Sequence, residues 1–155
     1  MRRTNGIGAA FVALLAVGTA ANADAQTKFE PLKFRVVTDK KTYAANTPIK
    51  MTFTVKNTSA KPIALTFTSG QRYDITILQG KKTLWQWSKG RMFTMDIGTE
   101  TLGAGKILVY TETYKPGTVG MPALKPGIYM ASAFPYTMNM VSLHTTTTFK
   151  VVAAK

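Results

Sequence analysis

The amino-acid sequence predicts an all-β protein, an antiparallel β-sandwich, from three observations. Short runs of alternating apolar and polar residues, rich in β-branched and aromatic types, recur through residues 31–152 and are separated by turn residues. Residues 26–155 show no apolar repeat with the period of a helix. Parallel pairing of successive strands would need crossover helices, which this sequence lacks. Many short strands with turn signals between them are typical of two sheets packed face to face.

The first 25 residues have the features of a cleaved signal peptide. Arg2 and Arg3 give it a positive start, and the apolar segment that follows, residues 7–17, is too short to cross a bilayer. Small residues then fit the cleavage rule, with the cut expected after Ala25 and a cut after Ala23 as the alternative. The sequence therefore predicts a leader over residues 1–25, a mature domain over residues 26–155, and a secreted or periplasmic protein.

The composition limits the class of protein. A chain of 155 residues with 45% hydrophobic residues is long enough for one domain with its own core. It has no cysteine, which excludes disulfides and thiolate metal sites. The formal net charge of +13 favours anionic partners, but the lysines are scattered and form no nucleic-acid-binding arm. We expect a monomer with no transmembrane anchor and no nucleic-acid partner.

Alternating residues predict the strands of the first half of the domain. The clearest alternation lies in residues 49–56, where Ile49 and Met51 point one way while threonines and lysines point the other. Tyr43, within a polar connection over residues 39–46, is expected to pack against the core. The strands predicted up to residue 78 are 31–38, 49–56, 63–67 and 73–78.

The central stretch, residues 67–93, predicts the start of a β-meander. The strand over residues 73–78 reverses through a polar turn into a returning strand, 83–88. Gly90 permits a second reversal, after which residues 92–97 are predicted to form a third strand.

Both tryptophans of the chain lie on the returning strand of this meander. Trp85 and Trp87 are two residues apart, so their indoles project from the same face of the strand. We interpret one as a core residue between the sheets and the other as a cap on the edge of the sandwich. An aromatic platform for a ligand or partner is the alternative.

The second half of the domain repeats the pattern with longer connections. Glycines over residues 103–105 predict a turn, and a loop rich in proline and glycine follows at residues 116–126. The strands predicted here are 106–114, 127–135 and 143–152.

The sequence offers no convincing catalytic set. His144 is the one histidine, and no acid is close to it in sequence to complete a triad. The scattered acids are expected to be solvated and paired with lysines. No glycine-rich phosphate loop precedes a helix. We therefore predict that the protein is not an enzyme, and we assign no catalytic residue.

Methionines near the histidine form one conceivable metal site. Met138 and Met140, together with His144, have the soft thioether and imidazole groups that bind copper(I), with Met121 and Met130 as further candidates. Methionine more often fills gaps in a core. We predict no cofactor and no metal ligand, and keep a small-ligand or copper-binding domain of the cell envelope as the alternative function.

A set of spaced residues in the central stretch, extended by segments 55–59, 102–105 and 124–129, resembles the pattern of the BsuPI-type intracellular proteinase inhibitor family over roughly residues 48–133. The resemblance implies an immunoglobulin-like sandwich and inhibition of a proteinase through exposed loops. The residues of the central stretch that carry the resemblance are Gln71, Tyr73, Asp74, Trp85, Trp87, Ser88, Gly90 and Phe93.

Taken together, these observations predict an exported, non-enzymatic protein-binding domain whose partner is an exported proteinase or another protein. Two loops, residues 115–126 and 136–142, are the candidates for contact with it because of their length and expected exposure. The candidate partner-binding residues are Lys115, Met121, Tyr136, Met138 and Met140.

Overall fold

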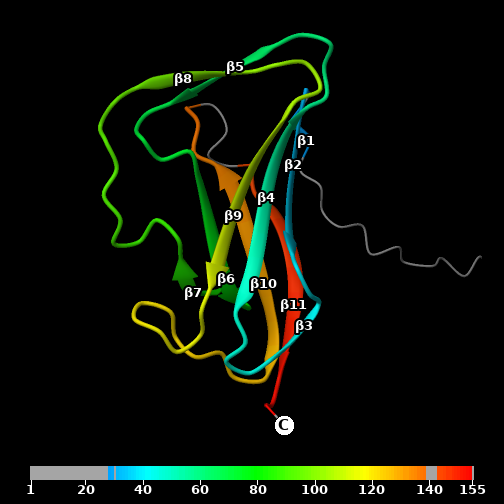
Figure 1. Ribbon diagram of the computed structural model, residues 1–155, viewed down its shortest axis with the longest axis vertical. Coiled ribbons are helices and arrows are strands. Elements are labelled where there is room, and N and C mark those ends of the chain that lie inside the picture. The colour runs from blue at the N-terminus through cyan, green and yellow to red at the C-terminus, as the bar shows by residue number, and fades with distance from the viewer. Residues whose placement is uncertain (1–27, 30, 139–142, 155) are drawn as a thin grey trace, which may run out of the picture.

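Strands account for the regular structure throughout the part of the chain that the structure describes. This computed structural model describes residues 28–29, 31–138 and 143–154, which form strands β1 to β11 and no helix (Figure 1). Accordingly, the described residues include no helix long and apolar enough to cross a membrane. The predicted leader, residues 1–25, and Met140 of the candidate residues lie outside the described residues.

The first layer is a four-stranded antiparallel sheet that faces the viewer in Figure 1. Its strands, in spatial order, are β1 (Lys28–Phe29), β2 (Leu32–Thr38), β4 (Ile49–Asn57) and β9 (Ile107–Tyr114). β4 is the regular alternating strand that the sequence predicted, with Ile49, Met51, Phe53 and Val55 all buried. β9 forms one edge of this sheet.

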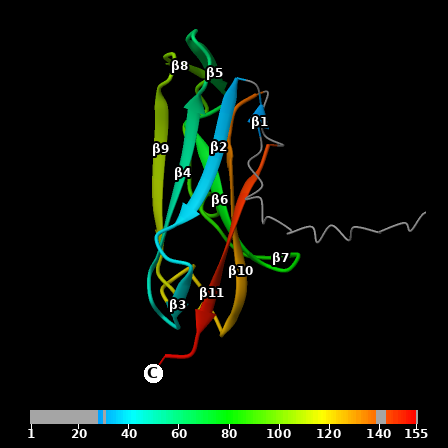
Figure 2. The same cartoon turned by 90° about the vertical axis from the view of Figure 1, so that its right-hand side faces the viewer.

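The second layer is a five-stranded sheet behind the first, and Figure 2 shows the two layers edge-on. Its strands, in spatial order, are β3 (Thr42–Ala44), β11 (Thr145–Val152), β10 (Gly127–Pro135), β6 (Tyr73–Gln79) and β7 (Lys82–Gln86). A separate pair, β5 (Ile63–Phe67) and β8 (Gly98–Leu102), lies at the upper end of the molecule in both views.

The core lies between the two main sheets and is made from every second residue of their strands. Phe34 on β2 stacks near Phe53 on β4, with ring centroids 6.5 Å apart. Ile75 and Ile77 on β6 face them with no exposed surface. Tyr43 is buried as predicted, and its ring meets Phe149 edge-on at 5.7 Å. The antiparallel β-sandwich predicted from alternation is therefore confirmed in its two layers and its core.

One strand pairs differently from the prediction. β3 runs parallel to β11, with Tyr43 opposite Val151. The argument against parallel pairing considered strands joined by a short connection. β3 and β11 come from the two ends of the domain, so the whole intervening fold serves as their connection and no crossover helix is required.

The predicted third strand of the central meander is wrong. β6 and β7 form the predicted hairpin, although β7 ends at Gln86, two residues early. Residues 91–97 form no strand, and the amide of Gly70 bonds to the carbonyl of Thr94 at 2.9 Å. The chain leaves the five-stranded sheet here, and β8 pairs with β5 instead. Local alternation could not reveal this change of sheet.

Candidate functional site

A buried carboxylate fixes the turn that follows β7. Asp74 is only 1% exposed, and its Oδ2 accepts hydrogen bonds from Ser88 Oγ at 2.5 Å and from Gln86 Nε2 at 2.7 Å. Its Oδ1 accepts from the backbone amides of Ser88 at 3.2 Å and Ile75 at 2.9 Å. The sequence analysis expected the acids to be solvated, which is wrong for Asp74 because these four neutral donors take the place of water. We call Asp74, Gln86 and Ser88 the Asp74 network.

An aromatic stack connects this turn to the opposite sheet. Tyr73 lies between Tyr110 and Trp87, with ring centroids 4.3 Å and 4.4 Å away. Phe93 continues the stack at 5.6 Å from Trp87, and the guanidinium of Arg91 lies 4.5 Å from the centre of the Trp87 ring. Offset aromatic contacts of this kind add to the gain from burial. The stack therefore holds the edges β7 and β9 together.

A phenol–carboxylate pair lies beside the stack. Tyr73 donates a hydrogen bond to Glu112 Oε1 at 2.6 Å, so Glu112 is not simply solvated either. Burial, and then this hydrogen bond to a carboxylate, raises the pKa of Tyr73 well above its ordinary value. The neighbouring indole Nε1 of Trp87 is buried and has no partner among the described residues.

The remaining residues of the central pattern also have structural roles. Trp85 is 8% exposed and meets the ring of Tyr114 edge-on at 5.4 Å. Gln71 is buried and donates to the carbonyl of Tyr73 at 3.1 Å. Gly90 has a φ of 79°, a conformation that favours glycine. Trp85 is thus the core tryptophan and Trp87 the one that covers the edge, in agreement with the first of the two interpretations.

The β9–β10 loop, residues 115–126, is anchored at its base. Tyr114 at the end of β9 donates a hydrogen bond to the carbonyl of Pro122. The amide of Lys115 lies 3.0 Å from Met121 Sδ. Burial raises the pKa of Tyr114 to about 12, as expected for a phenol enclosed under the loop. The base of the loop is therefore packed into the sandwich.

The tip of the β9–β10 loop is a tight turn that presents one apolar side chain. The amide of Gly117 bonds to the carbonyl of Met121 at 2.8 Å, and the amide of Met121 bonds back to Thr118 at 2.9 Å. Gly120 has a φ of 74°, as the third residue of such a turn requires. Val119 at the apex is fully exposed. The sequence analysis missed Val119, although the flanking glycines at 117 and 120 were a signal for it.

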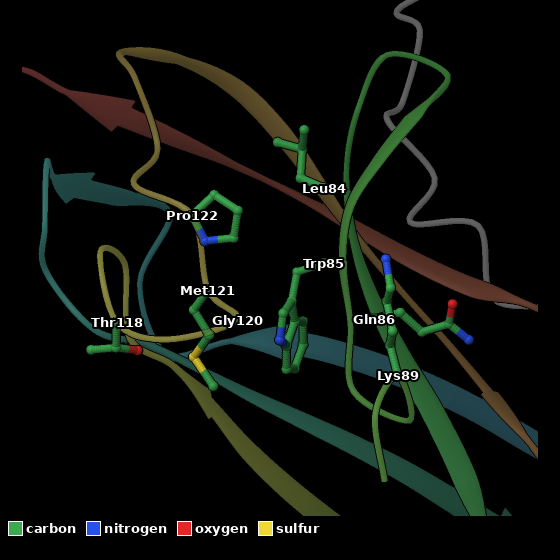
Figure 3. A pocket seen from close by; sticks show the side chains of 8 residues that line it. All are labelled: Leu84, Trp85, Gln86, Lys89, Thr118, Gly120, Met121 and Pro122. Atoms are coloured by element: carbon green, nitrogen blue, oxygen red, sulfur yellow. The ribbon is translucent and has the colours of Figure 1, made fainter.

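A hollow of about 470 Å³ separates the loop from β7 (Figure 3). The Trp85 indole and the Met121 thioether lie on facing sides of it, and Lys89 lies at its β7 side. Its lining residues are Leu84, Trp85, Gln86, Lys89, Thr118, Gly120, Met121 and Pro122. Among the predicted contact residues that the structure describes, only Met121 contributes to it.

The predicted contact residues fall at opposite ends of the sandwich. Lys115 and Met121 belong to the loop before β10, whereas Tyr136 and Met138 follow its last residue. A strand of nine residues is roughly 25 Å long. Tyr136 is half-buried against Phe134, with ring centroids 6.2 Å apart, and Met138 is exposed. The two sets of predicted contact residues therefore do not form a single continuous surface for one partner.

This separation also limits which of the predicted ligands could share one copper ion. Met121 cannot share a metal ion with Met138, because they lie at the two ends of β10. Met130 is in the middle of that strand, between Leu78 and Thr148. His144 Nδ1 lies 3.3 Å from Ser132 Oγ, and its ring packs 4.5 Å from Phe134. The described residues contain no group of three histidine or acidic side chains suited to a metal.

The fold and this loop define a class, a β-sandwich that presents an anchored loop with an exposed apolar tip. The chain belongs to the BsuPI family, described as intracellular proteinase inhibitors, and the family model matches residues 36–140. The resemblance inferred from the sequence is therefore confirmed. No curated protein matches the chain.

Similar solved structures are distant. The CARDB domain of the PF1109 protein from Pyrococcus furiosus, in complex with di-metal ions, is 17% identical with a TM-score of 0.46, and the match covers 83% of this chain and all of that one. Spo0M, a sporulation control protein from Bacillus subtilis, is 13% identical with a TM-score of 0.46, covering 81% of this chain and 50% of that one. The β-glucosidase EmGH1 from Erythrobacter marinus is also 13% identical, with a TM-score of 0.46, but this chain covers only 15% of its length.

The predicted location is corrected by the family. The sequence analysis predicted a secreted or periplasmic protein, and the family's description as intracellular contradicts this, so the prediction is wrong. It rested on the charge and hydropathy of residues 1–25 and on the small residues that fit the cleavage rule, whereas the family match lies in the folded domain. The restriction of the partner to exported proteinases is withdrawn with it.

Proposed function

We propose that the protein is a non-catalytic, reversible inhibitor of a proteinase and that the β9–β10 loop makes the central contact. The observation that carries this proposal is the exposed Val119 at the apex of a turn whose base is bonded to the sandwich. Family membership supports a proteinase as the partner. The inhibitory loop itself is inferred from geometry alone.

The fixed conformation of the β9–β10 turn lowers the entropic cost of binding. A flexible loop loses conformational freedom when a partner orders it, and this loss reduces affinity. Here the hydrogen bonds between Gly117, Thr118 and Met121 already hold the turn in one conformation. The Val119 side chain is fully exposed and loses no contact within the fold on binding. Its burial in a pocket of the proteinase would therefore add favourable hydrophobic free energy to binding.

The charge of the chain supports rapid encounter with an acidic enzyme. Lys115 and Lys89, next to the loop and the hollow, are exposed, and the whole chain has a formal charge of +13. Attraction between proteins of opposite net charge speeds their association, and salt screens this attraction. We therefore expect the association rate to fall as ionic strength rises, while the dissociation rate changes less.

The proposal is tested by assaying a panel of purified proteinases with and without excess protein. The wild type should slow at least one proteinase reversibly at a near-stoichiometric ratio. Val119→Asp should weaken inhibition by at least about thirtyfold, the loss of about 2 kcal/mol that marks a hot spot. Met92→Asp is the matched control, because Met92 is 97% exposed in another segment.

Two results would contradict the proposal in different ways. If no proteinase is slowed by the wild type, the function is not inhibition. If inhibition occurs and Val119→Asp behaves like Met92→Asp, the loop assignment fails, and the segment around Tyr136 and Met138 at the other end of β10 becomes the candidate.

We also infer that the sandwich is immunoglobulin-like. Two mainly antiparallel sheets of four and five strands packed face to face support this assignment. Inter-strand proton contacts measured by NMR that do not place these strands in two facing sheets would reject it.

A further inference from the structure

The outer face of the four-stranded sheet places positive charges opposite each other. Lys33 on β2 is the register partner of Lys56 on β4, and Arg35 lies two residues further along β2, opposite Thr54. Neighbouring strands are only about 4.8 Å apart, and like charges directly opposite each other are unfavourable. The sheet therefore carries an unfavourable placement of like charges that its folding does not require.

No carboxylate compensates this charge among the described residues. The outward-facing positions there are Lys33, Arg35, Val37, Lys50, Thr52, Thr54, Lys56, Ile107, Val109, Thr111 and Thr113.

The carboxylates of the described chain lie elsewhere. Asp74 is buried on β6, Glu100 pairs with Arg72 at 2.6 Å, and Glu112 accepts from Tyr73 on the inner side of β9. Asp39 follows the far end of β2 and accepts hydrogen bonds from the Tyr43 hydroxyl and the Lys50 amide. Asp96 is in the irregular segment before β8. In the part of the chain that the structure describes, Lys33, Arg35 and Lys56 take part in no ion pair.

The three cationic side chains line one hollow. It has a volume of about 310 Å³, and its walls are Lys33, Arg35, Thr54, Lys56 and Ile107. Ile107, the register partner of Lys56 on β9, is half exposed and gives the hollow an apolar side. The hollow thus combines positive charge, a hydroxyl group and one aliphatic wall.

We propose that this hollow is a binding site for a small organic phosphate. The Arg35 guanidinium can present two parallel N–H groups to one phosphate, and the two lysines act as point charges on either side of it. A dianion between Lys33 and Lys56 would convert a cross-strand repulsion into two attractions. The aliphatic wall at Ile107 suits the organic part of a phosphate ester. The site is on a sheet face away from the β9–β10 loop and is independent of proteinase inhibition.

The test uses the full chain and soluble probes at constant ionic strength, adjusted with sodium chloride. Titration with glycerol 3-phosphate, followed by amide chemical shifts, should give saturable changes centred on residues 33–35, 54–56 and 107. Inorganic phosphate should bind at the same residues but more weakly, since it makes no contact with Ile107. Lys33→Ser/Lys56→Ser should weaken the affinity at least about tenfold, because two charge-assisted contacts are lost.

The matched control removes the same charge elsewhere. Lys81→Ser/Lys82→Ser changes two adjacent exposed lysines, in and after the turn between β6 and β7, and should keep the affinity within about twofold if the site is specific. Equal losses in the two double variants would show a general charge effect and overturn the proposal. So would shifts spread over all lysines, or binding only to phosphatidylglycerol vesicles with no saturable binding of soluble phosphate. Both variants should keep the wild-type unfolding midpoint or exceed it, since repulsion is removed.

Discussion

The turn after β7, which the Asp74 network fixes, and the β9–β10 loop are both irregular connections, but they are held in different ways. In the Asp74 network the side chains of Asp74, Gln86 and Ser88 hydrogen-bond to one another, so their polar groups are already paired within the fold. In the β9–β10 loop the turn is held mainly by backbone groups, and the side chain of Val119 has no structural contact.

The difference separates residues that shape the fold from those available to a partner. The residues of the central stretch that carry the family resemblance belong to the Asp74 network or surround it, and their contacts explain them as scaffold. A functional contact is better sought where the backbone is fixed and the side chain is free. The pattern around Trp85 and Trp87 identifies the family, while the loop before β10 is the proposed contact with the partner.

Trp85 touches both regions, so its removal should have the largest effect. The indole packs on Tyr114 at the base of the loop and also lies on the strand that leads to Ser88. Trp85→Ala should lower the free energy of unfolding by about 3–5 kcal/mol, the cost of a large cavity. Urea unfolding followed by circular dichroism measures this, with the partly exposed Trp87→Ala expected to cost less. A Trp85 variant as stable as wild type would place this indole outside the core.

Asp74→Ala should have the next largest effect and should act on the first region alone. Removal of the carboxylate leaves the Ser88 amide and hydroxyl without their acceptor and takes one of two acceptors from the Gln86 amide, at a cost of about 3 kcal/mol. Inhibition by the folded fraction should remain, because the β9–β10 loop is untouched. Asp96→Ala, at an exposed acid, should change stability by less than about 0.5 kcal/mol. Equal effects of the two substitutions would remove the structural role assigned to Asp74.

Alkaline pH should loosen both regions, since each contains an enclosed phenol. The pKa of Tyr114 is about 12 in the folded protein, and that of Tyr73 is also raised, against about 10 for a tyrosine in the unfolded chain. The folded state therefore holds these protons more tightly. Their contribution to stability is complete below about pH 10 and is lost as the pH rises toward 12.

This dependence is measured by urea unfolding at pH 9, 10 and 11, with tyrosinate absorbance recorded in parallel. Tyr114→Phe should show a smaller loss of stability over the same interval, because one of the titrating groups is gone. A wild-type stability that does not change from pH 9 to 11 would contradict the enclosure of these phenols.

Val119→Asp should have the smallest effect on stability. The side chain is fully exposed, so the free energy of unfolding should change by less than about 0.5 kcal/mol while inhibition is lost. Asp74→Ala should do the opposite and lower stability while inhibition by the folded fraction remains. If Val119→Asp unfolds the protein, the loop is part of the core and the distinction between the two regions fails.

Prediction from the sequence worked where a strand's own residues determine its structure. The alternation in β2 and β4 fixes which residues are buried, because successive side chains of a strand point to opposite faces. It failed at residues 92–97, where alternation persists but no partner strand is available. It also misjudged Asp74, because the donors that satisfy its carboxylate come from Gln86 and Ser88 across the hairpin.

The sequence by itself determined the all-β class, the core positions of most strands and the family, since these depend on local periodicity and on side chains at fixed spacing. The tertiary structure alone decided which strands pair beyond the β6–β7 hairpin, that β3 runs parallel to β11, and that Lys115 and Met138 lie at opposite ends of the molecule. It also decided that Lys33 stands opposite Lys56. Pairing and register depend on contacts between residues far apart in the chain, and no local pattern encodes those contacts.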